Sequence, residues 1–202
     1  VSDVMKGGSL ALVDTNRDAL TTIQRLAERI FEHTECGVDV DASTDRTKVM
    51  EDSDFVVLTF SDRNAFFRGR DTEIAEKNGV RMCSSDTIGP GGIFRALREV
   101  PHAISMAEDV AELAPNAWVV NFVNPTTVLG MALRRYAPDV KSFALCDGHH
   151  EPYNTLNWCK RAEILPNDAE SVPDDVMDEL DLKIGGVNHC TWLVNFTYRG
   201  ED

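Results

Sequence analysis

The chain has 202 residues, which is enough for one domain of ordinary size and part of another. It carries 20 lysines and arginines against 34 aspartates and glutamates, a net charge of −14, and 43% of its residues are hydrophobic. This acidic balance argues against nucleic acid and anionic membrane surfaces as partners, because no basic stripe is available to meet phosphates. The sequence contains no apolar run of about 18 residues, the length that a membrane-spanning helix needs. The five cysteines, odd in number and without a CxxC pair, favour a reducing cytoplasm.

The first half of the chain alternates between apolar strand patterns and a helical pattern. An apolar run at 9–15 predicts a strand that ends in Asp14, and the apolar spacing of 16–34 predicts a helix. A short strand is expected at 37–44, then a helix start and turn before a buried strand at 55–60. The polar segment that follows carries no clear pattern.

The second half continues the same alternation. A helical region is expected over 91–113, broken near Pro101, because proline removes a backbone donor inside a helix. Strands are expected at 117–125 and 140–146, with a helix at 126–137 between them.

Near-continuous apolar strands separated by helices predict an α/β fold with a Rossmann-like, doubly wound parallel sheet covered on both faces. Ligands of such sheets gather at the carboxyl ends of the strands. Asp14, Phe60, Asn124 and Cys146 all lie at such ends, and the run "CDGHHEP" at 146–152 begins there. A ligand site is therefore expected around this run.

Asp14 has two interpretations. Rossmann proteins use an acid at the end of the second strand to bind the adenosine ribose, and an aspartate here also suits an N-cap or turn before a helix. The glycine fingerprint should precede that acid by about 20 residues, and only 13 residues precede Asp14. The sequence therefore reads as a fragment that begins inside the first crossover, without the first strand and its glycine loop.

The chain resembles glycoside hydrolase family four, the NAD- and divalent-metal-dependent glycosidases related to lactate and malate dehydrogenases. The resemblance spans essentially the whole chain, and the family continues past residue 202. It rests on these stretches, which occur in the family's order and spacing: "LVDTN", "STDR", "DSDFVVLTF", "DTIGPGGIFRALREVP", "NFVNPTT", "LCDG" and "IGGVNHCTW".

The resemblance implies a reaction unlike the two-carboxylate hydrolysis of most glycosidases. The sugar is oxidised at carbon 3 by NAD⁺, its carbon-2 proton is removed, and the glycosidic oxygen is eliminated. Water then adds to carbon 1 and the ketone is reduced again. A divalent metal, manganese first and cobalt or nickel as alternatives, stabilises the charge that develops on the sugar oxygens.

The resemblance also assigns the metal and the acid. Cys146 and His189 match the metal ligands, and Asp147 matches the acid that protonates the leaving group in the 6-phospho-α-glucosidase branch. A buried thiol, a satisfied core histidine and a helix-capping aspartate are the ordinary alternatives for these residues. His150 is expected to line or rim the sugar pocket. The carbon-2 base is expected beyond residue 202, and Tyr198 reads as a strand residue.

Cofactor and sugar contacts follow in the same way. Asp14 matches the ribose ligand of NAD, and Thr44 and Asp45 resemble the loop near the adenine. Asn124 matches the asparagine that contacts both the nicotinamide ribose and the sugar. Two further sugar contacts are implied, Arg95 and Asn188; Arg98 is expected to be an ion-paired helix residue.

The implied organisation is an NAD-binding domain over residues 1–148 and the start of a second α+β substrate and metal domain over 149–202. The implied substrate is a small carbohydrate, of the α-glucoside, α-galactoside or 6-phospho-α-glucoside type, and the implied assembly is a homodimer or homotetramer. The fragment alone is expected to be inactive. A lactate- or malate-type dehydrogenase, which needs no Cys–His metal pair, and a non-catalytic nucleotide- or sugar-binding domain remain the alternatives.

Overall fold

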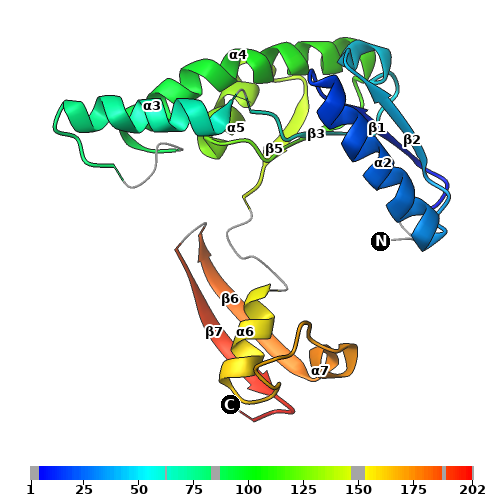
Figure 1. The fold of residues 1–202 in the computed structure, drawn as a ribbon, viewed down its shortest axis with the longest axis vertical. Coiled ribbons are helices and arrows are strands. Elements are labelled where there is room, and N and C mark those ends of the chain that lie inside the picture. Colours follow the sequence, from blue (N-terminus) through cyan, green and yellow to red (C-terminus); the bar gives the residue numbers. More distant parts are fainter. Residues whose placement is uncertain (1–4, 62, 83–86, 147–152, 188–189, 202) are drawn as a thin grey trace. The chain divides into compact units, whose positions relative to one another are not determined.

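The computed structural model describes residues 5–61, 63–82, 87–146, 153–187 and 190–201. These residues divide into two compact units, Val1–Leu145 and Cys146–Asp202. The sequence-based boundary of 148 lies three residues after this division. Each unit is built around its own sheets (Figure 1).

The first unit opens with a parallel strand pair and its connecting helix. Strand β1 (Ser9–Val13) pairs with β2 (Asp39–Ser43) in parallel, and α2 (Arg17–Thr34) packs against both. The side chain of Asn16 begins the helix, because its Oδ1 accepts hydrogen bonds from the backbone nitrogens of Asp18 and Ala19. A short 3₁₀ turn, η1 (Arg46–Lys48), follows β2.

The second sheet of this unit contains β3 (Phe55–Leu58), β4 (Trp118–Asn121) and β5 (Lys141–Ala144), all parallel, with β4 in the centre. Helices α4 (Gly89–Leu113) and α5 (Thr126–Tyr136) pack against this sheet, and the helices and the sheet together form the hydrophobic core. The fully or nearly fully buried core residues from these elements include Ala103, Ala107, Val110, Val119, Leu129 and Leu133.

The parallel strands form two sheets, so the expectation of one continuous sheet was wrong for the described residues. In the doubly wound order 3-2-1-4-5-6, the first strand separates strands 3-2 from strands 4-5-6. The observed orders β2-β1 and β3-β4-β5 reproduce those two groups. No described strand lies at position 1, which accounts for the division.

Coverage of the three-stranded sheet also differs from expectation. Phe55, Val57, Trp118 and Phe143 are 66%, 54%, 43% and 42% exposed. The rings of Trp118 and Phe143 meet edge to face, with centroids 5.8 Å apart. Among the described elements, α4 and α5 cover one face, and this aromatic face carries no comparable layer.

Two helices differ from the sequence-based prediction. Helix α3 (Asn64–Lys77) occupies the polar segment where no element was expected. Helix α4 runs through Pro101 without a break. The carbonyl that loses its donor there belongs to Leu97, a residue that is 69% exposed, so this turn lies on the solvent side of the helix.

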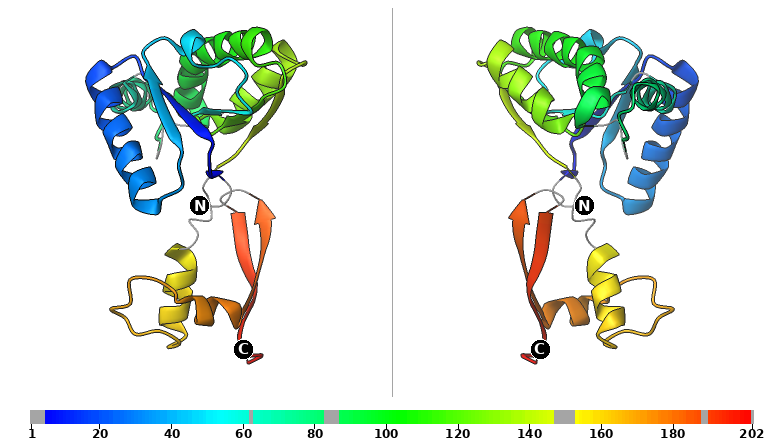
Figure 2. Two further views of the ribbon diagram at one scale, coloured as in Figure 1. Left: turned by 90° about the vertical axis from the view of Figure 1, so that its right-hand side faces the viewer. Right: turned by 90° about the vertical axis from the view of Figure 1, so that its left-hand side faces the viewer.

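The second unit contains α6 (Tyr153–Arg161), α7 (Asp174–Asp178) and an antiparallel hairpin of β6 (Leu180–Val187) and β7 (Cys190–Tyr198) (Figure 2). Tyr198 is a strand residue, as predicted. In the part of the chain that the structure describes, none of the helices combines the length and apolarity needed to cross a membrane.

Candidate functional site

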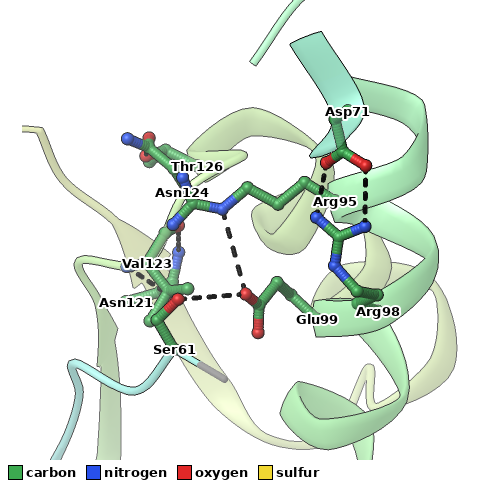
Figure 3. A network of polar contacts seen from close by, with 9 residues as sticks. All are labelled: Ser61, Asp71, Arg95, Arg98, Glu99, Asn121, Val123, Asn124 and Thr126. Carbon is green, nitrogen blue, oxygen red and sulfur yellow. Dashed lines mark hydrogen bonds and ion pairs between the residues drawn. The ribbon is translucent and has the colours of Figure 1, made fainter. Parts of the chain in front are cut away.

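A network of polar side chains gathers where β3 and β4 end (Figure 3). Asn121, the last residue of β4, is fully buried and fixes the turn that follows. Its Nδ2 donates to the carbonyl of Val123 at 3.0 Å, and its Oδ1 accepts from the Val123 backbone nitrogen at 3.2 Å. The turn leads to a cis peptide bond between Asn124 and Pro125, after which α5 begins.

Asn124 presents its amide beside this turn. Its Oδ1 accepts a hydrogen bond of 2.9 Å from the hydroxyl of Thr126, and the residue is half-buried. The amide oxygen is therefore engaged inside the protein, while the amide nitrogen remains a donor for a ligand oxygen.

Arg95 reaches the same place from α4. Its side chain is only 8% exposed, and it extends from the helix toward the Asn124 segment (Figure 3). The structure thus brings together two of the predicted substrate contacts, Arg95 and Asn124. A buried guanidinium beside an amide can hold sugar oxygens by several directed hydrogen bonds.

The start of α4 depends on two glycines of the "GPGG" run. Gly89 has φ of +68°, which favours glycine, and Pro90 lies in the first turn, where its missing N–H costs nothing. A Cβ on Gly92 would lie 2.5 Å from the carbonyl of Thr87, so the backbone can pass only without a side chain. These residues fix the helix that positions Arg95.

Glu99 lies one turn after Arg95 and completes the network. Its Oε1 is 3.9 Å from Nε of Arg95 and accepts a hydrogen bond of 3.3 Å from the hydroxyl of Ser61, which follows β3. Burial raises the pKa of the Glu99 carboxyl, and the nearby Arg95 charge offsets part of this effect. Neither Glu99 nor Ser61 was predicted. Ser61 directly follows a predicted strand and Glu99 is four residues after Arg95, and both signals were available.

The predicted cofactor residues lie in the β1–β2 part of the unit. Asp14 is exposed at the carboxyl end of β1, and its Oδ1 accepts from the backbone nitrogen of Asn16 at 2.7 Å. Asp14 is thus a turn residue, while Asn16 is the helix cap. An exposed carboxylate at this strand end fits a ribose, because its second oxygen can accept from a hydroxyl.

The loop after β2 holds the other predicted cofactor residues. Thr44 is exposed, and Asp45 caps η1 by accepting from the backbone nitrogen and the hydroxyl of Thr47. The hydrogen bonds from Thr47 lower the pKa of Asp45. Arg46 ties the loop to α4 through an ion pair with Asp109 and a hydrogen bond of 2.8 Å to the Ser105 hydroxyl.

The predicted acid Asp147, the predicted metal ligand His189 and the predicted sugar contacts His150 and Asn188 lie outside the described residues. Cys146 is described, and it is half-buried after β5. An imidazole suits nickel and related ions, and manganese, which prefers oxygen ligands, fits the Cys146–His189 pair when sugar oxygens complete its coordination.

Comparison with known proteins gives the family. The model of the family 4 glycosyl hydrolases matches residues 1–157. The chain is 38% identical over 185 residues to a probable 6-phospho-beta-glucosidase of Bacillus subtilis strain 168. This match covers 91% of the chain and 38% of that protein. It is also 33% identical over 153 residues to an alpha-galacturonidase of Thermoanaerobacterium saccharolyticum, and this match covers 76% of the chain and 32% of that protein. The chain therefore belongs to the family 4 glycosyl hydrolases, and it spans about a third of the length of these relatives.

Solved structures confirm the fold class. A 6-phospho-alpha-glucosidase from gut microorganisms in complex with NAD and Mn²⁺ superposes with a TM-score of 0.68 at 24% identity, covering 96% of this chain and 41% of that one. A lactate dehydrogenase from Eimeria maxima superposes with a TM-score of 0.60 at 13% identity, covering 96% and 50%. The predicted Rossmann-like α/β fold is correct, and this dehydrogenase shares the fold.

Proposed function

We propose that the whole protein hydrolyses O-glycosidic bonds of a small carbohydrate with NAD and a divalent metal ion. The observation that carries the proposal is the cluster of Arg95 and Asn124 at the carboxyl ends of β3 and β4, in a chain of the family 4 glycosyl hydrolases. A glycosidase with bound NAD and Mn²⁺ shares the fold.

Three described residues have defined tasks in this proposal. Asp14 accepts hydrogen bonds from the adenosine ribose hydroxyls, and its charge disfavours a 2′-phosphate. The Asn124 amide nitrogen donates to an oxygen of the ribose or the sugar, because its own oxygen is held by Thr126. The Arg95 guanidinium holds sugar oxygens on the α4 side. Bound NAD⁺ would supply the acceptor for a hydride from sugar carbon 3 and return it later.

Residues around "CDGHH" complete the chemistry. Cys146 and His189 would hold the metal, which supplies a Lewis acid beside the oxygens on carbons 2 and 3. Asp147 would hold a proton at the glycosidic oxygen as it leaves. His150 and Asn188 would contact the sugar. Within the glycosidases, the aspartate after Cys146 favours an α-glucoside, an α-galactoside or a 6-phospho-α-glucoside, and we place the enzyme in the cytoplasm as a homo-oligomer.

The testing experiment is hydrolysis of a panel of p-nitrophenyl glycosides by the whole protein, stripped of metal with EDTA and of nucleotide by dialysis. We expect activity only when Mn²⁺ and NAD⁺ are both restored, with no net formation of NADH. Activity that needs neither would contradict the proposal. The dehydrogenase alternative predicts one NADH for each 2-hydroxy acid consumed, without any requirement for metal.

A further inference from the structure

Two opposite charges on α4 are buried at the carboxyl ends of the strands. The Arg95 side chain is 8% exposed and that of Glu99 is 3% exposed. Taking both ions out of water is costly, and their attraction repays the cost only when the geometry is excellent. Here the closest approach, from Nε to Oε1, is 3.9 Å, which is beyond hydrogen-bond distance. The pair by itself is therefore a poor source of stability.

The arrangement of the pair points to a role in orientation. Glu99 lies on the Nε side of Arg95, while the end of the guanidinium points toward the Asn124 segment (Figure 3). Ser61 holds the same carboxyl oxygen, Oε1, through a hydrogen bond from its hydroxyl. The second carboxyl oxygen, Oε2, is buried and has no hydrogen-bond partner among the described residues. The carboxyl thus contacts Arg95 and Ser61 and caps no helix or turn that the structure describes.

We propose that Glu99 is a positioning residue for Arg95: its carboxylate, held by Ser61, aims the guanidinium at the substrate beside Asn124. Glu99 acts through Arg95 and does not touch the sugar. The proposal rests on the proposed function for the nature of the substrate, but the orientation of Arg95 by Glu99 is independent of it. A four-residue spacing on one helix suits this task, since residues i and i+4 lie on the same face.

Orientation can be measured without any substrate. In whole protein labelled with ¹⁵Nε-arginine, we expect the Arg95 Nε–H order parameter to fall from about 0.8 in the wild type to below about 0.6 in Glu99→Ala. Ser61→Ala should give a smaller fall. Glu108→Ala, an exposed glutamate on the same helix, is the matched control and should change nothing. An Arg95 order parameter that is unchanged in Glu99→Ala would overturn the proposal.

A double-mutant cycle tests the consequence for the reaction. On the p-nitrophenyl glycoside that the wild type hydrolyses fastest, Glu99→Ala should raise KM about tenfold and change kcat less than about twofold, because substrate and transition state lose the same contact. In an Arg95→Ala background the same substitution should change kcat/KM less than about twofold. If Glu99→Ala fails to fold, Glu99→Gln replaces it in both experiments and should give a smaller effect of the same kind.

The outcomes separate the two proposals. A loss from Glu99→Ala that is equally large in the Arg95→Ala background would mean a general structural role and would overturn the positioning role. Absence of hydrolysis on every glycoside of the panel would overturn the proposed function, and the order parameter would still decide the role of Glu99.

Discussion

Arg98 of α4 and Asp71 of α3 form a two-point ion pair, with Nη2 2.6 Å from Oδ2 and Nη1 3.2 Å from Oδ1. The Asp71 side chain is 6% exposed, and the Arg98 guanidinium also lies over the ring of Phe67, 4.7 Å from its centroid. The pair joins α3 to the helix that carries Arg95 and Glu99 (Figure 3). This agrees with the expectation that Arg98 is an ion-paired helix residue.

Replacing Asp71 by alanine should lower the free energy of unfolding by about 2 kcal/mol, because Arg98 loses its partner in a largely buried setting. The value lies below that of a fully buried pair, since a quarter of the Arg98 side chain is exposed to water. Urea denaturation measures the change. Glu73→Ala is the control on the same helix, because its pairs with Arg70 and Lys77 are exposed, and it should leave the midpoint almost unchanged. Equal losses in both variants would contradict this account.

The fold illustrates what sequence patterns can predict. The strands at β1, β3, β4 and β5 were predicted because each is a short apolar run, and apolar runs mark strands covered by helices. Helix α3 was missed because its apolar residues are spread around the helix. The buried Ala75 and the Arg98–Asp71 pair attach it to the rest of the unit. The continuity of α4 through Pro101 was missed because only the tertiary structure reveals that the turn before the proline, with Leu97, lies on the solvent side.

The residues of the candidate site were likewise predicted only in part. Asp14, Arg95 and Asn124 could be named because strand ends and family motifs mark them. Glu99 was missed although its spacing of four residues from Arg95 was available, because a glutamate in a helix usually faces water and only the packing of α4 shows that it is buried. The roles of Cys146, Asp147 and His189 remain predictions.

The stability of the wild type should depend on pH through Glu99. Burial raises the pKa of this carboxyl above its usual 4.5, against the opposing effects of Arg95, Ser61, His102 and Arg98. The folded state therefore keeps the proton to higher pH than the unfolded state. The stabilisation is fully present below pH 4.5 and is lost as pH rises through the raised pKa.

Glu99→Gln, which mimics the protonated acid, should lack this dependence. In urea titrations between pH 4 and pH 8, the free energy of unfolding of the variant should increase relative to that of the wild type as pH rises. If the difference in free energy of unfolding stays constant with pH, or changes in favour of the wild type as pH rises, the pKa of Glu99 is not raised.

Asp14→Ala should weaken NAD binding by the whole protein about tenfold or more, because a charged acceptor of ribose hydroxyls is lost. The preference for NAD over NADP should narrow as well. Calorimetric titration with both nucleotides measures the effects. Asp41→Ala, an exposed aspartate in the neighbouring β2, should bind both as the wild type does. Tighter binding of NADP than NAD by the wild type would refute the assignment.

Cys146→Ser should weaken Mn²⁺ binding to the whole protein at least about tenfold, because a serine hydroxyl is a poor ligand at neutral pH and a thiol near a metal is readily deprotonated. Electron paramagnetic resonance of free Mn²⁺ gives the affinity. The control is Cys36→Ser, which removes a buried thiol from the loop that connects α2 to β2. This variant should bind Mn²⁺ as tightly as the wild type does. Unaltered affinity in Cys146→Ser would rule out Cys146 as a ligand.

The central claim is that glycoside cleavage passes through oxidation at carbon 3 and loss of the carbon-2 proton. Hydrolysis by the whole protein with NAD⁺ and Mn²⁺ in D₂O tests this claim most directly, because the proton that returns to carbon 2 then comes from solvent. Mass spectrometry and proton NMR of the released sugar should show one deuterium at carbon 2. A released sugar with hydrogen retained at carbon 2 would indicate direct displacement of the kind that paired carboxylates catalyse, and would contradict the account.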